Sequence, residues 1–386
     1  FLTLIVAFAT LCGFAQDVEP SNVNFYEVKG KLKNVPDGTV LQLLRFEGER
    51  GFFVGTSKVE SGEFCFKSTP SGSGVDKLMI GGLMNEGFSL LGTFLWASAG
   101  DSILVEGEDN MLFTWKVTGG APENAIWAAY IQKSYKEWKR YEQILLEQKA
   151  LKSQLGSNED AVAKFIQLEK ESDMLQMRIC ANDLKIMKHT AVDDIWMERF
   201  SYSSLVASLY KDKSCIKGLK RLYNNLTDEQ RKHPQAKKAY ENLYPQQQEL
   251  VKAFDGELTD LDGNKHSLAE LKGKYILLDF WASGCGPCIT ALPELALVAE
   301  MYKEKLCVVS VNIEPADNWR EALKKHPIAW YNWNDSKDGT GIYDLYNANG
   351  GGIPLFVLIS PDGYIIDKWY GYGDGAITNQ LKGKIE

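Results

Sequence analysis

The chain has 386 residues, of which 45% are hydrophobic and 24% are charged, and its formal net charge is −8. This length exceeds one ordinary hydrophobic core, so we expect two or three domains, and the composition excludes a chain biased toward disorder. The acidic balance argues against a nucleic-acid partner held by a basic surface. The four histidines are too scattered to form a histidine-based metal site.

The first fifteen residues are almost entirely apolar, and no charge occurs before Asp17. This run is too short to span a bilayer comfortably, and the small residues up to Ala15 predict a signal peptide, 1–15, cleaved after Ala15. Because a positive n-region and an initial Met are missing, we interpret this signal peptide as truncated. The expected location is the periplasm or cell envelope. Lipid attachment at Cys12 is less favoured, since Leu11 stands where a small residue is needed; a buried N-terminal strand is a further alternative.

Residues 24–120 are predicted to form an all-β, sandwich-like domain. Apolar residues alternate in 25–28 and 40–43, and turn signals recur, for example in 36–38 and 60–62. Short strands with turns at this spacing are typical of a small sandwich or barrel. The aromatic residues of this region are interpreted as core or interface side chains.

Residues 121–250 are predicted to form a helical segment. No proline occurs between Pro122 and Pro234, and the sequence Gly156-Ser157-Asn158-Glu159 combines a helix stop with a good N-cap. Apolar residues recur at helical spacing: Trp127, Tyr130, Ile131, Trp138, Tyr141 and Leu145. We interpret this stripe as packing rather than as a cofactor site.

Six cysteines follow the predicted signal peptide: Cys65, Cys180, Cys215, Cys285, Cys288 and Cys307. Cys65 and Cys307 lie in predicted strands and are expected to be inert. Cys180 and Cys215 lie in the helical segment. They could form a structural disulfide if their helices are antiparallel neighbours, and otherwise they are two buried free thiols. Outside the cytosol a disulfide can persist.

From residue 251 onward the pattern alternates between strands and helices. Strands are predicted at 275–280 and 306–313, and a helix runs from 288 to 301 between them. Two further strands, 355–360 and 364–369, flank a turn. This order predicts an α/β domain with a mixed sheet over 251–386.

The segment Trp281-Ala282-Ser283-Gly284-Cys285-Gly286-Pro287-Cys288 places two cysteines at the predicted strand-to-helix turn. A thiolate, not a thiol, attacks a disulfide, and the unpaired N–H groups and dipole of a helix N-terminus lower a thiol pKa. We therefore expect Cys285 to be the nucleophile and the more buried Cys288 to be the resolving thiol. A zinc site lacks a second ligand pair, c-type haem attachment needs His where Ile289 stands, and a purely structural disulfide is the remaining alternative.

The predicted strand and the two-cysteine turn that follows it make residues 251–386 resemble the thioredoxin fold. Within that fold, they resemble the cell-envelope thiol:disulfide oxidoreductases related to TlpA and ResA. The resemblance implies that Asp279 is a buried acid that moves the proton of the resolving thiol. It also implies a kink at Pro293 and a cis peptide bond at Ile353-Pro354, opposite the dithiol. Substrate contacts are implied for Trp281, Gly284, Gly286, Pro287, Ile353 and Pro354.

Three positions depart from that pattern. Thioredoxins carry Trp where Gly284 stands, so partner recognition should be looser here. The Glu that many envelope relatives place before the helix proline is absent. Ser310 stands near the position of the lysine that neighbours the buried acid, so Asp279 should lack a cationic partner and have a raised pKa. More weakly, residues 24–118 resemble the small β domain of unknown function that precedes thioredoxin domains in exported Bacteroidetes proteins.

The sequence thus predicts an exported thiol:disulfide oxidoreductase, and more specifically a reductase with a role in cell redox homeostasis. Its partners would be disulfides or thiols of envelope proteins and a membrane or envelope electron donor, with no cofactor, metal or nucleic acid. One alternative is a thiol peroxidase or antioxidant protein, although the pattern Pro-x-x-x-Thr-x-x-Cys is absent around both cysteines. The other is a binding or scaffold module whose dithiol is vestigial.

Overall fold

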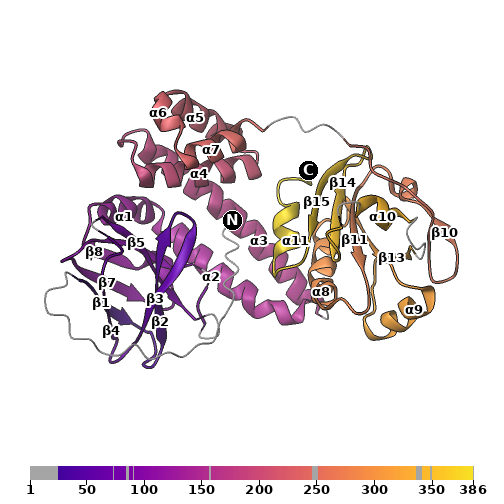
Figure 1. Cartoon of the computed structure of the whole chain (residues 1–386), viewed down its shortest axis with the longest axis horizontal. Helices are drawn as coiled ribbons and strands as arrows, with labels where there is room; N and C mark the ends of the chain where they lie inside the picture. The colour runs from indigo at the N-terminus through magenta and orange to yellow at the C-terminus, as the bar shows by residue number, and fades with distance from the viewer. Residues whose placement is uncertain are drawn as a thin grey trace. The chain divides into compact units, whose positions relative to one another are not determined.

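The computed structural model describes residues 25–72, 74–83, 87–89, 91–155, 158–245, 251–335, 341–347 and 350–385 (Figure 1). The predicted signal peptide, 1–15, lies outside these ranges. The chain divides into two compact units: 1–86 with 92–125, and 87–91 with 126–386. In the part of the chain that is described, no helix is both long and apolar enough to cross a membrane.

The first unit contains two four-stranded sheets, as the alternating pattern predicts. One has the order β4 (Glu63–Ser68), β1 (Tyr26–Lys33), β7 (Ser102–Glu108), β8 (Lys116–Gly119); the other has β3 (Arg50–Lys58), β2 (Val40–Glu47), β5 (Asp76–Gly82), β6 (Thr93–Ala97). Every second residue of β1 is buried, starting with Tyr26 and Val28. The period of two gives β1 one buried face, and β4 and β7 alternate in the same way.

Helices occupy 123–243, as predicted. They are α1 (Glu123–Lys133), α2 (Tyr135–Leu151), α3 (Glu159–Met187), α4 (Asp194–Leu209), α5 (Lys213–Asn224), α6 (Asp228–Arg231) and α7 (Pro234–Leu243). Polar side chains begin several of them: Asn158, Asp193 and Asp212 each accept a backbone N–H in the first turn of α3, α4 and α5. Trp127, Tyr130 and Trp138 of the predicted stripe are buried.

The C-terminal part is an α/β domain with a mixed seven-stranded sheet. Its order is β10 (Lys265–His266), β9 (Leu258–Thr259), β13 (Tyr331–Asn334), β12 (Leu306–Asn312), β11 (Tyr275–Trp281), β14 (Leu355–Ile359), β15 (Ile365–Tyr370). The central strand β11 is parallel to β12 and antiparallel to β14. Four helices accompany the sheet: α8 (Gly286–Met301), α9 (Ala316–Lys325), α10 (Ile342–Tyr346) and α11 (Ala376–Leu381).

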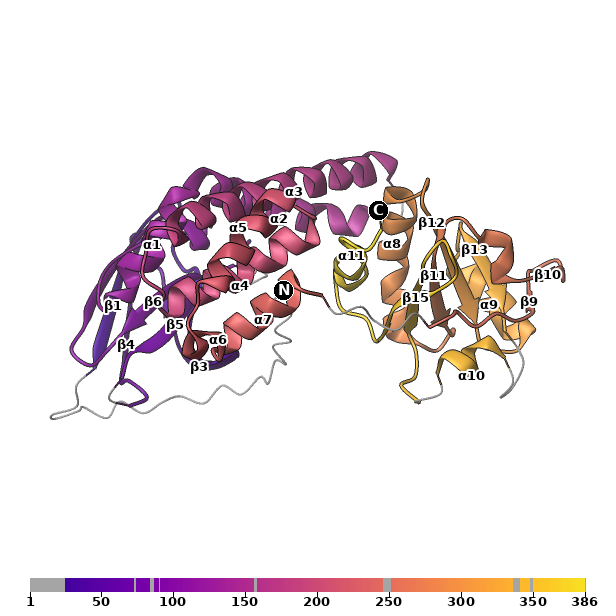
Figure 2. The ribbon, with the colours of Figure 1, turned by 90° about the horizontal axis from the view of Figure 1, so that it is seen from above.

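The two faces of this sheet bury different sets of side chains. Leu277 packs with Ala291 and Leu295 of α8 and with Ile377 of α11, so these helices cover one face (Figure 2). Leu278 belongs to a second cluster, which includes side chains of α10. Successive residues of β11 thus point to opposite faces, and both faces are covered, which explains why its sequence is apolar except at Asp279.

The helical segment and the α/β domain share buried contacts. Leu297 of α8 packs against Leu155 and Phe165, the latter on α3. Near the C-terminus, the Lys382 ammonium lies 2.6 Å from a carboxylate oxygen of Glu169. Coulombic attraction to the α3 carboxylates outweighs the opposing effect of burial and raises the pKa of Lys382. An apolar contact and a largely buried ion pair therefore join α3 to the α/β domain.

Candidate active site

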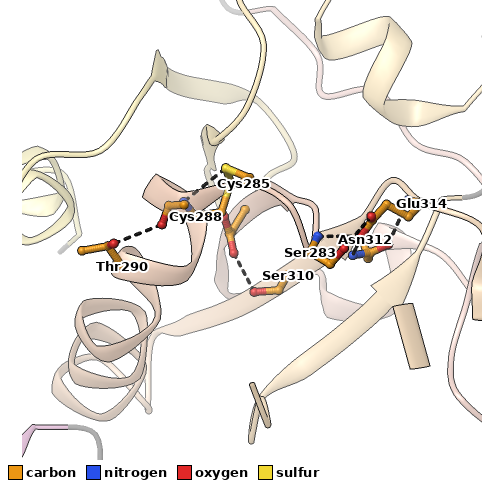
Figure 3. The surroundings of a disulfide bond; sticks show 9 residues. Ser283, Cys285, Cys288, Thr290, Ser310, Asn312 and Glu314 are labelled. Atoms are coloured by element: carbon orange, nitrogen blue, oxygen red, sulfur yellow. Dashed lines mark hydrogen bonds between the residues drawn. A yellow bond between two sulfur atoms is a disulfide. The ribbon is translucent and has the colours of Figure 1, made fainter. Parts of the chain in front are cut away.

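The turn between β11 and α8 places the two cysteines together. Cys285 and Cys288 are joined by a disulfide, with their Cα atoms 5.3 Å apart (Figure 3). Cys285 is the N-cap of α8, and its sulfur accepts the backbone N–H of Cys288 at 3.2 Å. Cys285 is half-buried, whereas Cys288 is 1% exposed. The first thiol of the pair is therefore both the accessible one and the one at the positive end of the helix.

The local sequence explains why the helix begins at this point. Pro287 lies in the first helical turn, where its missing N–H costs no hydrogen bond. The Thr290 hydroxyl donates to the Gly286 carbonyl at 3.0 Å and so supports the same turn. Pro293 lies inside α8, as expected for the kink proline, and it cannot donate to the carbonyl four residues earlier.

Asp279 lies beneath the first turns of α8. Residues two apart on a strand share a face, so Asp279 lies on the same face of β11 as Leu277 and Trp281. Leu277 contacts Ala291 of α8, and Trp281 packs in a cluster with Cys288. The Asp279 carboxyl is therefore enclosed between two apolar contacts of α8, and it is 1% exposed.

Among the described residues, Asp279 has a single hydrogen-bond donor, and no cation contributes to its pKa. Ser310 faces Asp279 in the parallel β11–β12 pairing, and its hydroxyl donates to Asp279 Oδ2 at 2.8 Å. Trp330 Nε1 donates in turn to the Ser310 hydroxyl at 2.9 Å. Asp279 Oδ1 has no hydrogen-bond partner among the described residues. Burial raises the pKa of Asp279 to about 7, against a smaller lowering by Ser310, in the direction expected from the sequence.

Glu314 holds the loop that leads into the dithiol. Its carboxylate accepts the Ser283 backbone N–H at 2.6 Å and the Ser283 hydroxyl at 2.7 Å, and Asn312 donates to it at 3.3 Å (Figure 3). Asn334 in turn donates to the Glu314 carbonyl at 2.8 Å. Burial opposes ionisation of Glu314, but these hydrogen bonds outweigh it and lower its pKa. Glu314 is a positioning residue for the turn.

The loop before β14 lies at the same cluster. The Ile353-Pro354 peptide bond is cis, as the resemblance implies. Ile353 packs with Cys285 against the group formed by Trp281, Cys288, Trp319 and Ala322. Phe280 and Leu355 are the last paired residues of β11 and β14 at this end of the sheet. Ile353 precedes Leu355 by two residues, so it lies just outside the paired region.

The residues predicted to contact substrate differ in exposure. Trp281 is fully buried, because it packs between the dithiol and α9, so in this state it supports the site from inside. Gly284, Gly286 and Pro287 are exposed around Cys285. A Cβ on Gly284 would meet no atom within 4 Å. The face of the site is therefore open.

Glu314 and Trp330 were not among the residues predicted from the sequence. A usable signal existed for Glu314: it follows a buried strand that runs parallel to β11, and the carboxyl ends of parallel strands meet at one edge of a sheet. Trp330 had no such signal, because its contact with Ser310 depends on a long-range approach. Among the described residues, no group of three or more His, Cys, Asp or Glu side chains is placed to hold a metal ion.

Several known proteins are similar to this part of the chain. Residues 251–368 match the AhpC/TSA family. The chain is 43% identical over 121 residues to the thioredoxin-like protein YneN of Bacillus subtilis, covering 31% of this chain and 66% of that protein. It is 34% identical over 137 residues to the thiol-disulfide oxidoreductase ResA of Bacillus cereus, covering 33% of this chain and 72% of that protein.

A solved structure is also similar in this region. It is the thioredoxin domain of a thiol-disulfide oxidoreductase from Bacteroides vulgatus, with 28% identity and a TM-score of 0.32. The alignment covers 35% of this chain and 96% of that one. All of these matches concern about the last third of the chain.

Asp279→Asn should change the pH dependence of stability. A folded-state pKa of about 7, against about 3.9 in the unfolded chain, means that the native protein loses stability as the pH rises between these values. The variant, which cannot ionise there, should be more stable than wild type at pH 8 by up to about 4 kcal/mol, and the gain should vanish toward pH 4. Urea unfolding of both oxidised proteins across this pH range measures the difference.

The matched control is Asp362→Asn, which removes an exposed carboxyl from a turn of the same domain. It should leave the free energy of unfolding within about 0.5 kcal/mol of wild type at each pH. A stability difference between Asp279→Asn and wild type that did not depend on pH would contradict the raised pKa.

Proposed function

The chain belongs to the thioredoxin-like thiol-disulfide oxidoreductases related to ResA, and we propose that it reduces disulfides of exported proteins with Cys285 as the nucleophile. One observation carries this proposal: the half-buried Cys285 caps α8 and accepts the Cys288 N–H, and the same helix covers a buried carboxyl whose pKa is about 7. Such an arrangement stabilises a thiolate and supplies a proton acceptor at neutral pH.

The proposed reaction begins with the reduced dithiol. The Cys285 thiolate attacks one sulfur of a substrate disulfide, which forms a mixed disulfide and releases the first substrate thiolate. Cys288 then loses its proton and attacks the Cys285 sulfur, which releases the second substrate thiolate. Two electrons pass from the dithiol to the substrate, and the enzyme is left with the Cys285–Cys288 disulfide that the structure contains.

Asp279 would act on the second step. Cys288 is buried, so its thiol needs an internal acceptor before it can attack. A carboxyl with a pKa of about 7 is about half ionised at neutral pH and can take up this proton, then return it to the medium or a leaving thiolate. Ser310 keeps the side chain oriented without adding a charge.

The substrate would bind across the open face of the site. Ile353, beside Cys285 and just outside the sheet ladder, offers backbone groups with which an extended segment can pair. Gly284 and Gly286 leave the approach to Cys285 unobstructed. A protein disulfide in an extended segment therefore fits better than a small ligand that needs an enclosed pocket. Peroxide is not the substrate we propose, since Ala282 stands where a peroxidatic cysteine needs threonine.

The proposed location is the periplasm or cell envelope, where a disulfide can serve as a substrate. The oxidised enzyme would then be reduced again by a membrane or envelope electron donor. The support for this location is the apolar segment 1–15, together with the resemblance to envelope oxidoreductases.

Cys285→Ser should abolish the reduction of insulin disulfides. Serine cannot supply the thiolate, so kcat/KM should fall by about a thousandfold or more, to the uncatalysed background. Cys65→Ser, which changes an exposed cysteine of the β unit, is the matched control and should keep full activity. Cys288→Ser should accumulate a mixed disulfide with the substrate, detected by mass spectrometry. Unchanged insulin reduction by Cys285→Ser would refute the proposal and favour a vestigial dithiol.

The direction of electron flow predicts the reduction potential of the dithiol. A reductase should have a potential close to the thioredoxin value of about −270 mV, whereas an oxidant lies near about −120 mV. Equilibration of the full chain in glutathione buffers, followed by alkylation and mass spectrometry of the Cys285–Cys288 peptide, measures it. A value at the oxidising end would reverse the proposed direction but keep the exchange chemistry.

Gly284→Trp should improve the use of protein substrates. The position accepts a side chain without a clash, and its φ is not in the left-handed region, so the fold should not change. An indole beside Cys285 adds apolar contact to a bound segment, and KM for a protein disulfide should fall a few-fold, the equivalent of about 1 kcal/mol. Gly284→Ala is the control. The same few-fold change with a small-molecule disulfide would show that recognition of the partner chain is not the cause.

A further inference from the structure

A second pair of cysteines lies in the helical segment, far in sequence from the dithiol. Cys180 of α3 is 1% exposed and Cys215 of α5 is 4% exposed, and both carry free thiols in this structure. The Cys180 thiol donates to the Ser203 carbonyl of α4 at 3.4 Å, and each of the two thiols is the largest influence on the pKa of the other, as expected of neighbours. Nothing in the proposed reaction uses either of them.

The helix crossing explains why the two thiols meet. Cys180 and Leu184, four residues apart, share one face of α3, and Cys215 and Gly218, three apart, share one face of α5. A Cβ on Gly218 would lie 2.5 Å from the Leu184 side chain, so the glycine permits a close approach of the helices. The cysteines therefore lie on the faces of α3 and α5 that approach each other, as a disulfide requires.

The two thiols differ in a way that gives each a role. Cys215 is the third residue of α5, and its backbone N–H already bonds to the N-cap side chain of Asp212. The neighbouring Cys180 thiol lowers the pKa of Cys215, against the effect of burial, while the Cys215 thiol and burial raise the pKa of Cys180. Cys215 follows the exposed residues Lys213 and Ser214, so an oxidant reaches it first.

We propose that Cys180 and Cys215 form a second redox pair, which closes into a disulfide between α3 and α5 when a disulfide oxidant is present. The Cys215 thiolate attacks the oxidant, a low-molecular-weight or protein disulfide, and releases its first thiolate. Cys180 then loses its proton and attacks the Cys215 sulfur, which releases the second thiolate. Two cysteine thiols are oxidised, one disulfide is reduced to two thiols, and the protons pass to the released thiolates.

The test uses the full chain with Cys285→Ser and Cys288→Ser, so that the first dithiol cannot contribute. The folded protein is equilibrated with oxidised glutathione, alkylated, and digested with trypsin. We expect peptides 179–185 and 214–217 to be joined by a disulfide, while Cys65 and Cys307 enter no crosslink within the chain. On removal of the oxidant, dithiothreitol should restore both thiols.

Stability provides a second readout. The crosslink closes a long loop in the unfolded chain, so the oxidised protein should unfold at higher urea than the same protein after reduction. Cys180→Ala and Cys215→Ala, each added to the same background, should remove this difference. Cys65→Ala in that background should keep it.

Three outcomes would overturn the proposal. The first is full alkylation of Cys180 and Cys215 after equilibration with excess oxidant. The second is a crosslink that forms only in urea, which would show that the folded protein does not bring the thiols together. The third is pairing of Cys215 with Cys65 or Cys307 instead of Cys180.

Discussion

The burial of one carboxyl beneath the dithiol helix is the constraint on which the active site depends. Asp279 is enclosed by apolar contacts of α8, and the described part of the chain gives it one hydroxyl hydrogen bond and no cationic partner. Its ionisation therefore opposes folding at neutral pH, and the surrounding sheet has to supply the stability that this costs. A fully covered central strand does so, because both faces of β11 are packed. The same burial that weakens the fold brings the pKa of the carboxyl to the pH at which a thiol proton must move.

The helix above this carboxyl is fixed by contacts along its whole length. At its start, Glu314 holds the incoming loop through Ser283. In its middle, the buried Glu294 accepts backbone N–H groups from Gly375 and Thr378 and so ties α8 to the start of α11. Further along, Leu297 packs against the helical segment. The Cys285 sulfur is consequently placed by a rigid element, and substrate has only to approach it through an open face.

How much of this could be predicted from the sequence depends on the range of each interaction. The dithiol, its strand and its helix are adjacent in sequence, so local patterns identify them. The predicted fold of three parts, a β-rich region, a helical middle and a C-terminal α/β domain, is confirmed. Asp279 and Ser310 were both identified through the resemblance, which marks the position of a buried acid and the absence of the lysine beside it. Glu314 and Trp330 act across neighbouring strands, so no local pattern identified them. Trp281 was expected to contact substrate, yet it is buried, because the alternation of β11 turns it inward.

The two cysteine pairs follow the same electrostatics and differ in access. In each, one thiol lies at the start of a helix and has the more favourable environment for a thiolate, and the other is deeply buried. Around Cys285 the neighbours are glycines and a proline, so a protein substrate can reach the sulfur. Around Cys215 the helices α3 and α4 close the site, and only a locally opened turn admits an oxidant. Access therefore assigns the pair at 285 and 288 to exchange with partners, and the pair at 180 and 215 to a link within the chain itself.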